Sequence, residues 1–258
     1  MTFSTNRVFF ALIGLLWIAQ GCDNRCIHGK GNTVTQNRSP GSFSGVSFST
    51  EGTVYISQDS VTSFSVTAQQ NILDDLITKV QGDVLGIYNQ HCIRDQAPIL
   101  IHLSSPTINS LSLSGVGEMI TTSKIQSDHV DISVSGTGDF SSQDSIIAPA
   151  MSEDLSGTGS VNLLAGCTSM NSANSGTGTI TINGSADSHT INTSGSGDVH
   201  GYGFITNTTS VSISGSSNVE LFVNEKLDVT ISGSGNVYYK GSPVTTHISG
   251  SGSVIHVN

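Results

Sequence analysis

The sequence predicts an all-β protein, a single-stranded parallel β-solenoid whose coils each take about 20 residues. The main observation is the element Ser-Gly-x-Gly/Ser, which recurs eight times between residues 114 and 252 at intervals of 17 to 21 residues. Alternating apolar and polar stretches flank these elements, as in Val130-Asp-Ile-Ser-Val134. The chain also holds 29 glycines, and 11% of its residues are charged. This composition excludes a helix bundle, because glycine and β-branched residues destabilise helices.

Each repeat is expected to form one coil, with a corner at the Ser-Gly element and a strand on either side. Stacked coils then bury an apolar core that no single coil could bury. Glycine follows the first serine in every element, and we expect it to allow positive φ at the corner. These corner glycines are Gly115, Gly136, Gly157, Gly176, Gly195, Gly215, Gly233 and Gly250. Residues 34–258 would make roughly 11 coils; a β-propeller, with blades of about 40 residues, is the alternative architecture.

The first 21 residues have the layout of a bacterial lipoprotein signal peptide. Arg7 precedes a mostly apolar run from Val8 to Ala19, and Gly21-Cys22 follows. An apolar run of this length is too short to span a membrane as a stable helix. We therefore expect cleavage after Gly21 and lipidation of Cys22, including palmitate, which would anchor the protein to a membrane of the cell envelope. The alternative is an ordinary cleaved signal peptide, with Cys22 in a disulfide.

The rest of the chain divides into a tether at residues 22–41 and a β-solenoid domain at residues 42–258. Within the domain, residues 42–110 are expected to form capping strands, and residues 111–258 hold the repeats. A cap is needed because the open edge of a solenoid can pair with other chains. Residues 71–79 are expected to form a short helical turn capped by Asn71. The capping strands are expected at residues 42–48, 53–56, 64–66, 84–88 and 99–103.

The remaining cysteines and the charge balance exclude several kinds of binding site. With Cys22 lipidated, Cys26, Cys92 and Cys167 remain, so at most one disulfide forms and one thiol is left over. No Cys-x-x-Cys pair exists, which excludes a zinc ribbon or a thioredoxin-type motif. The formal charge of −10 argues against nucleic-acid binding, which needs basic patches.

Few residues are candidates for catalysis or metal binding. Asp139 and Asp198 end Gly-x-Gly-x-Asp elements, which resemble part of a calcium-binding repeat, although corner polar residues explain them better. The carboxylates of residues 128–131 and 153–154 are the best candidates for a β-helix carbohydrate-active enzyme, but solvated turn residues are the favoured interpretation. No metal, cofactor or catalytic residue is expected. Late in the chain lie four aromatic residues that could stack on sugars or complete the core: Phe204, Phe222, Tyr238 and Tyr239.

The order of motifs along the chain resembles a known family. The stretch from Phe43 to Tyr88 is followed by "PILIHLSSPTINSLSLSGVGEM" and then by the Ser-Gly repeats. This order is similar to the putative auto-transporter adhesin head GIN domain family, also called domain of unknown function 2807. The resemblance implies a right-handed β-helix on a secreted or lipid-anchored bacterial envelope protein, with no established enzymatic activity.

We therefore expect a lipid-anchored envelope protein that binds or scaffolds without catalysis, in the manner of an adhesin. It would lie on the periplasmic face of a membrane or on the cell surface. Its expected partners are the membrane, through the lipid anchor, and a carbohydrate or protein ligand; a homo-oligomer is a further hypothesis. The alternatives are a β-helix carbohydrate-active enzyme and an accessory protein that senses envelope stress.

Overall fold

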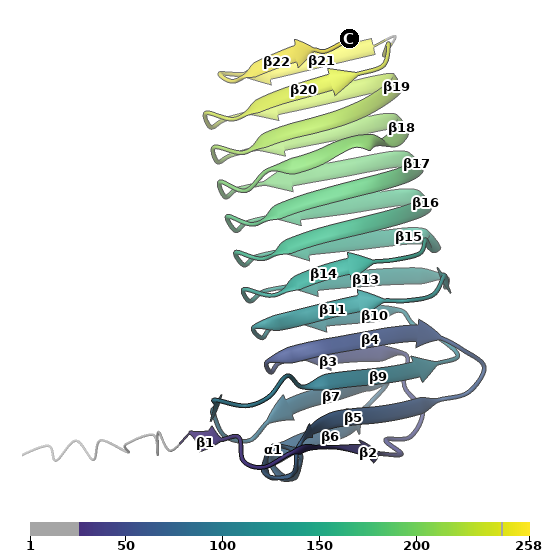
Figure 1. Cartoon of the computed structure of the whole chain (residues 1–258). Coiled ribbons are helices and arrows are strands. Elements are labelled where there is room, and N and C mark those ends of the chain that lie inside the picture. Colours follow the sequence, from purple (N-terminus) through teal and green to yellow (C-terminus); the bar gives the residue numbers. More distant parts are fainter. Residues whose placement is uncertain (1–25, 244) are drawn as a thin grey trace, which may run out of the picture.

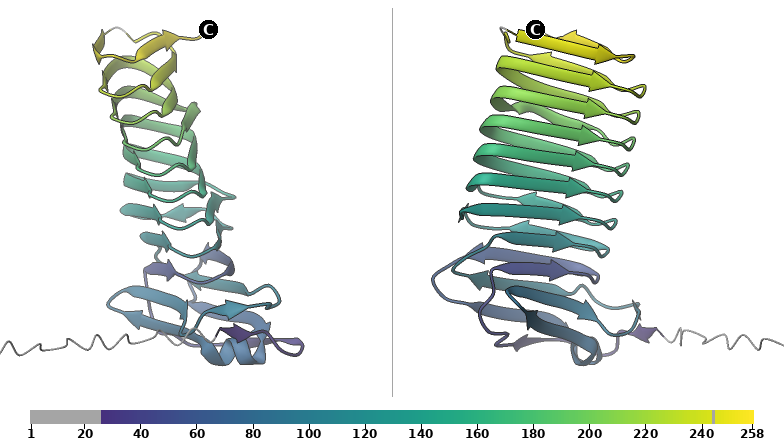
Figure 2. Two further views of the ribbon diagram at one scale, coloured as in Figure 1. Left: turned by 90° about the vertical axis from the view of Figure 1, so that its left-hand side faces the viewer. Right: turned by 180° about the vertical axis from the view of Figure 1, so that it is seen from behind.

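The computed structural model describes residues 26–243 and 245–258, which form a narrow rod of stacked coils on a wider base (Figures 1 and 2). The near strands of Figure 1 run from left to right and the far strands from right to left as the chain climbs, so the coil is right-handed. The predicted fold class, a right-handed parallel β-solenoid with an N-terminal capping region, is confirmed. The stack has about 7 turns rather than roughly 11, because much of the first third of the chain forms the base.

The rod consists of strands that pair in parallel with the coil above and the coil below. Each coil makes a tight turn on one side and a rounded bend on the other, and from β16 to β19 one strand runs through the bend. Its strands are β10 (Ser110–Leu113), β11 (Gly117–Thr121), β12 (Ile125–Gln126), β13 (His129–Val134), β14 (Asp139–Ser142), β15 (Ile146–Leu155), β16 (Ser160–Asn174), β17 (Thr179–Thr193), β18 (Val199–Ile213), β19 (Asn218–Ile231), β20 (Asn236–Lys240), β21 (Thr245–Gly250) and β22 (Ser253–His256).

The base is a cap in which parallel stacking gives way to antiparallel pairs. Strands β3 and β4 lie directly under β10 and β11 in parallel register, whereas β2–β5, β5–β9 and β6–β7 are antiparallel. Two strands of the cap, β1 and β2, come from the segment expected as a tether. The elements are β1 (Ile27–His28), β2 (Thr33–Asn37), β3 (Gly45–Phe48), β4 (Gly52–Gln58), β5 (Ser63–Gln69), α1 (Gln70–Asp75), β6 (Leu76–Gln81), β7 (Val84–Asn89), β8 (Ile93–Arg94) and β9 (Leu100–Ser105).

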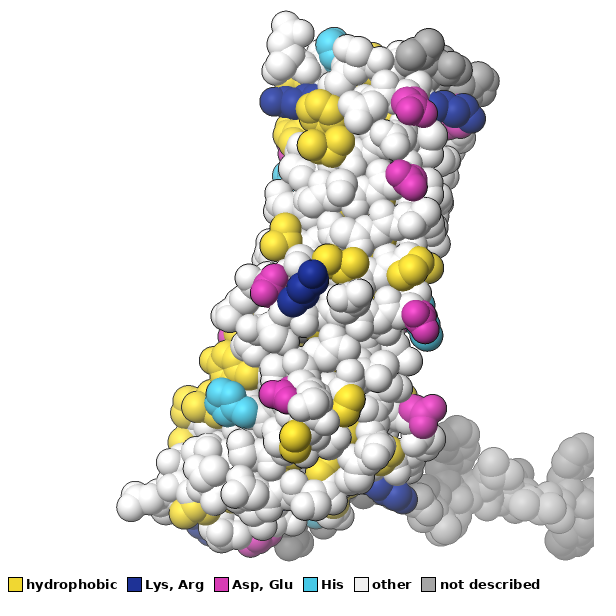
Figure 3. Space-filling model, turned by 90° about the vertical axis from the view of Figure 1, so that its right-hand side faces the viewer, with side chains coloured by type: hydrophobic (Ala, Val, Ile, Leu, Met, Phe, Trp, Pro, Cys, Tyr) yellow, Lys and Arg dark blue, Asp and Glu magenta, His cyan; other side chains and the backbone are white. Residues whose placement is uncertain are grey.

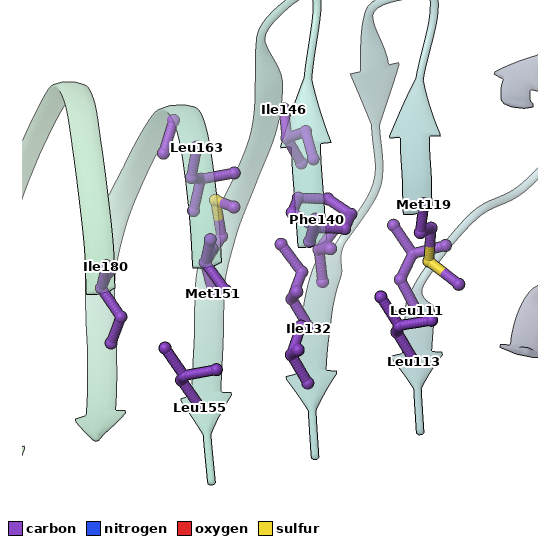
Figure 4. Close-up of a cluster of buried hydrophobic side chains, with 14 of the residues drawn as sticks. Leu111, Leu113, Met119, Ile132, Phe140, Ile146, Met151, Leu155, Leu163 and Ile180 are labelled. Atoms are coloured by element: carbon purple, nitrogen blue, oxygen red, sulfur yellow. The ribbon is translucent and has the colours of Figure 1, made fainter. Parts of the chain in front are cut away.

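The core runs along the inside of the rod and follows the alternation of the sequence. In β13, Val130, Ile132 and Val134 are buried and the residues between them are exposed. Inward residues of successive coils stack on one another, as Met119 does on Phe140 (Figure 4). Each fully buried aliphatic side chain contributes roughly 1.5–3 kcal/mol. The pattern therefore stabilises the stack once the coils are in register.

The corners need glycine because the coils approach too closely for a Cβ atom, rather than because the backbone there has positive φ. Of the eight, Gly250 alone has a positive φ, of 110°. The expectation of positive φ is therefore wrong for the other seven. At Gly176, a Cβ atom would collide with the carbonyl oxygen of Gly157 in the coil below, and this close approach recurs along the corner column. The backbone N–H of Thr177 donates to the same Gly157 carbonyl at 3.1 Å, so the corners form a hydrogen-bonded ladder.

The short helix differs from its prediction at both ends. Helix α1 covers residues 70–75 and begins after Gln69, which makes no side-chain cap. Asn71 lies inside the helix, where its side chain accepts from the Lys30 N–H and donates to the His28 carbonyl. Asn71 therefore fastens the entering chain instead of capping the helix. Across residues 26–243 and 245–258, no helix has the length and apolar character needed to cross a membrane.

A disulfide between Cys26 and Cys92 ties the start of the described chain to the cap. The bridge spans 66 residues of sequence and lies next to the β1–β8 pair. Cys167 is the remaining free thiol of the described chain. Disulfides persist mainly in oxidising compartments, so this pairing fits a protein exported from the cytoplasm.

Removing the disulfide is expected to destabilise the cap. The double substitution Cys26→Ser/Cys92→Ser should lower the free energy of unfolding by about 4 kcal/mol, because it frees a long loop in the unfolded chain. Urea denaturation followed by circular dichroism would measure the change. Cys167→Ser is the control and should change stability by less than about 1 kcal/mol. Equal losses in the two variants would contradict a stabilising role for the bridge.

Candidate binding surface on the flank of the rod

The carboxylates considered for catalysis do not form a shared site. On the outer face of β13, Asp131 accepts a hydrogen bond from the Ser152 hydroxyl of the next coil. His129 is exposed on the same strand, and Asp128 lines a shallow hollow between coils. Glu153 and Asp154 point to opposite faces of β15, with Glu153 buried and Asp154 exposed. A pair of carboxylates that face one substrate is therefore not formed by these residues.

Glu153 is a buried core residue, and its interpretation as a solvated turn residue is wrong. Its side chain is 1% exposed, and neither carboxylate oxygen has a hydrogen-bond partner within the described residues. Burial raises the pKa of Glu153 well above its usual value, and Asp154 adds to the increase, while the nearby Ser172 hydroxyl opposes it. Burial therefore favours the protonated, uncharged form of Glu153.

A buried histidine lies close to this acid. His189 accepts from or donates to the Ser172 hydroxyl through Nε2, at 2.9 Å, and Ser172 is the register partner of Glu153. Burial lowers the pKa of His189 to about 3. The cluster of Glu153, Ser172 and His189 is enclosed in the core, so it cannot reach a substrate in this conformation.

The aspartates of the Gly-x-Gly-x-Asp elements fasten neighbouring coils. Asp139 Oδ1 accepts from the backbone N–H of Ser160 at 2.8 Å, and Asp198 Oδ1 accepts from the backbone N–H of Asn218 at 2.8 Å. Each carboxylate therefore bonds one coil further along the stack. Among the described residues, no three His, Cys, Asp or Glu side chains gather as metal ligands would.

The free cysteine lines the shallow hollow on the flank, together with Asp128 and Pro149. Cys167 is half-buried. Burial raises the pKa of its thiol to about 11, and Asp187 adds to the increase. The thiol is therefore protonated at neutral pH, which makes Cys167 a poor nucleophile.

A β-bulge in β18 distinguishes one part of the flank from the regular stack. Ile180 pairs with Val199 and Asn183 with Gly203, so one extra residue is inserted in β18 opposite β17. On the other side, the register between β18 and β19 shifts again between residues 201 and 205. Figure 1 shows the ribbon of β18 buckling at this place. Bulges of this kind often redirect side chains near functional sites.

Two aromatic side chains beside the bulge lie in different environments, one in the core and one at the surface. Phe204 is 1% exposed and packs edge-on against the buried His189 ring, at a centroid distance of 5.3 Å. Tyr202 is partly exposed, and the Lys240 ammonium lies 5.1 Å from the centre of its ring. Burial raises the pKa of the Tyr202 phenol, and Glu220 and Tyr238 add to the increase.

Tyr202 belongs to a cluster of partly exposed side chains that we call the aromatic patch. Its members come from β18, β19 and β20, on adjacent coils. His200 Nδ1 and Glu220 Oε2 are 2.8 Å apart, and Glu220 and Phe222 are the register partners of Tyr238 and Lys240. Figure 3 shows hydrophobic side chains gathered beside a basic side chain near the C-terminal end of the rod. The patch consists of His200, Tyr202, Glu220, Phe222, Tyr238 and Lys240.

Sequence reasoning found only part of this patch. Of the four late aromatic residues, Phe222 and Tyr238 belong to it, whereas Phe204 is in the core and Tyr239 packs against the core. Tyr202 and the polar members were missed. The available signal was the repeat itself, because the six patch residues stand six and eight positions after Ser194, Ser214 and Ser232.

The fold and this flank define a β-solenoid whose outer surface, rather than an enclosed cleft, offers groups for binding. Residues 42–243 match the family described as "Putative auto-transporter adhesin, head GIN domain". The chain belongs to this family, as its sequence resemblance indicated. No curated protein matches the chain.

Several solved structures share the fold. A putative lipid binding protein from Parabacteroides distasonis ATCC 8503 is 23% identical, with a TM-score of 0.83 over 91% of this chain and 100% of its own. A putative adhesin from Parabacteroides merdae ATCC 43184 is 19% identical, with a TM-score of 0.82 over 90% of this chain and 99% of its own. A putative adhesin from Bacteroides fragilis NCTC 9343 is 21% identical, with a TM-score of 0.69 over 90% of this chain and 100% of its own. At these identities the likeness establishes the fold.

Proposed function

We propose that this protein is a lipid-anchored, non-catalytic binding rod of the bacterial cell envelope, with an adhesin-like role. The predicted cleavage at Gly21 and lipidation at Cys22 lie outside the described residues. The family description and the adhesin names of two structural relatives support the binding role.

One geometric observation carries the proposal. Cys22 precedes Cys26 by four residues, and the disulfide of Cys26 holds the chain at the cap. The aromatic patch lies on β18 to β20, near the opposite end of the rod (Figure 1). A lipid on Cys22 would place the cap beside the membrane and hold the patch away from it. Several acyl chains on one cysteine would give a firm anchor, because a single chain binds only marginally.

The alternative of a β-helix carbohydrate-active enzyme receives less support. Such an enzyme needs acid and base groups that face one bond of the substrate. Here Glu153 is enclosed in the core, and Asp131 and Asp139 hold hydroxyl or amide groups of the next coil. Association with a second copy of the chain remains a prediction, which sedimentation velocity would test.

Substitution of the lipidation residue tests the anchor. In cells that express a C-terminally tagged chain, Cys22→Ala is expected to move the protein from the membrane fraction to the soluble fraction. Cys167→Ala is the matched control and should leave the protein in the membrane fraction. Retention of Cys22→Ala in the membrane would contradict the anchor.

Protease treatment of intact cells and spheroplasts then shows whether the rod lies on the cell surface or in the periplasm. Digestion of the tagged rod in intact cells is expected for an adhesin-like protein on the cell surface. Protection until the outer barrier is opened would place the rod in the periplasm and would overturn the adhesin-like role. A periplasmic scaffold or a stress-sensing accessory protein would then be the better description.

A further inference from the structure

We propose that the aromatic patch binds an uncharged, extended glycan whose sugar rings follow the rod axis across β18, β19 and β20. This inference rests on the proposed binding function and names its ligand class. It is carried by the chemistry of the patch, by its coil spacing and by the bulge that turns Phe204 inward while Tyr202 stays at the surface.

The first argument is the combination of aromatic faces on adjacent coils. Tyr202, Phe222 and Tyr238 are partly exposed on three successive coils of one flank. The C–H groups on the flat face of a pyranose ring carry partial positive charge, and the face of an aromatic ring is negative. Stacked coils lie about 4.8 Å apart, a spacing comparable with one sugar ring of an extended chain.

The second argument is the set of polar groups between the rings. Glu220 offers carboxylate oxygens as acceptors, while His200, which pairs with it, and Lys240 offer N–H donors. The side chains of His200 and Glu220 are 45% and 31% exposed, so both remain accessible to a ligand. Sugar hydroxyls are donors and acceptors that lie around the edge of the ring. A glycan stacked on the aromatic residues would therefore present its hydroxyls to these groups.

The third argument is the bulge in β18. In a regular strand, residues two apart point to the same face. The bulge instead directs Phe204 into the core and leaves Tyr202 on the surface, under the Lys240 ammonium. That contact holds the ring in place before any ligand arrives, and a fixed ring loses less entropy on binding.

The charge of the patch and of the whole chain favours an uncharged glycan over anionic ligands. Lys240 is balanced within the patch by Glu220, and the whole chain has a formal charge of −10. A polyanion such as nucleic acid or a uronic-acid polymer would meet repulsion. A membrane surface would be approached at the cap end if Cys22 carries lipid, whereas the patch lies toward the other end of the rod.

Isothermal titration calorimetry on the full-length chain in mild detergent tests the proposal. The probes are cellotetraose, chitotetraose and maltotetraose, which are uncharged, and tetragalacturonate, which is anionic. At least one uncharged probe should bind, and both Tyr238→Ala and Tyr202→Ala should weaken that binding about tenfold. Tyr238→Phe keeps the aromatic face and should bind within about twofold of the unaltered chain.

The matched control is Tyr88→Ala, which removes a tyrosine that is 39% exposed on β7 of the cap. It should leave the affinity unchanged. Circular dichroism melting of every variant shows that a loss of binding is not a loss of folding; if an alanine variant melts early, Glu220→Gln replaces it. Glu220→Gln should weaken binding severalfold, because it removes the charged acceptor.

Three results would overturn the inference. Absence of binding by all three uncharged probes would reject the ligand class, and tightest binding of tetragalacturonate would reject the uncharged ligand. Equal weakening by Tyr88→Ala and Tyr238→Ala would place the site elsewhere. Membrane fractionation and protease accessibility do not depend on these outcomes, so failure of the glycan inference and failure of the proposed function can be told apart.

Discussion

Replacing Gly176 by alanine is expected to lower the free energy of unfolding by more than about 3 kcal/mol. The added Cβ would collide with the carbonyl oxygen of Gly157, which already accepts hydrogen bonds from Thr177 at 3.1 Å and Gly178 at 3.3 Å. The collision involves backbone on both sides, so no flexible side chain can move to relieve it. Separating the coils would break the ladder of hydrogen bonds at the corner and open the core beneath it.

The control for this prediction is Gly166→Ala on β16. A Cβ atom there would meet only the Ile147 side chain, at an ordinary contact distance of 3.7 Å. Gly166 also has no positive φ. Its replacement should change stability by less than about 1 kcal/mol. Urea denaturation of both variants measures the difference, and equal effects would show that corner spacing does not limit the stack.

The free energy of unfolding is expected to decrease on both sides of mildly acidic pH because of two buried groups. The pKa of Glu153 is raised in the fold, so the folded chain keeps a proton that the unfolded chain releases above about pH 4.5. Stability therefore falls as the pH rises from that value toward the folded pKa. His189 has the opposite effect, because its pKa falls from 6.5 to about 3 on folding. The unfolded chain binds that proton first, so stability falls as the pH decreases from 6.5 toward 3.

Each group contributes a slope of up to about 1.4 kcal/mol per pH unit. Between about pH 4.5 and 6.5 the two slopes oppose each other, which predicts a plateau of stability. Above the plateau the loss continues until the pH reaches the raised pKa of Glu153, and beyond that pH its ionised carboxylate would be an unpaired charge in the core. Acid also weakens the cap, because hydrogen bonds from His91 and Asn89 lower the pKa of Asp75 despite the opposing effect of burial.

Glu153→Gln isolates the alkaline part of this profile. It should remove the loss of stability above the plateau and leave the acid side, which depends on His189, in place. Glu118→Gln is the matched control, because it makes the same substitution at an exposed position of β11. Urea denaturation from pH 4 to pH 9 measures the profiles. If the unaltered chain and Glu153→Gln kept a constant difference across this range, Glu153 would not titrate on unfolding.

Much of the architecture could be predicted because it depends on local patterns. The Ser-Gly spacing located the corners, and the alternation in β13 located core residues such as Ile132. The same alternation, applied to β15, places residue 153 inward between Met151 and Leu155. The residue type of Glu153 predicts an exposed side chain, but its position in the alternation places it in the core.

Other features depend on contacts between distant parts of the chain. The pairing of Cys26 with Cys92 could not be chosen from three remaining cysteines, because the fold of the cap decides which two meet. The absence of positive φ at most corners likewise follows from how closely the coils approach, rather than from the turn alone.

By itself, the sequence determined the coil, its period and the position of its corners, because a short local pattern repeats about every 20 residues, and the order of these patterns along the chain indicated the family. The tertiary structure alone decided where the regular register of the coils breaks. His200, Glu220 and Tyr238 lie in regular register on three coils, whereas the register shift after Gly201 carries Phe204 into the core. The physical reason is that hydrogen bonds between coils decide which side chains lie side by side on a solenoid surface. One inserted residue therefore changes which side chains meet.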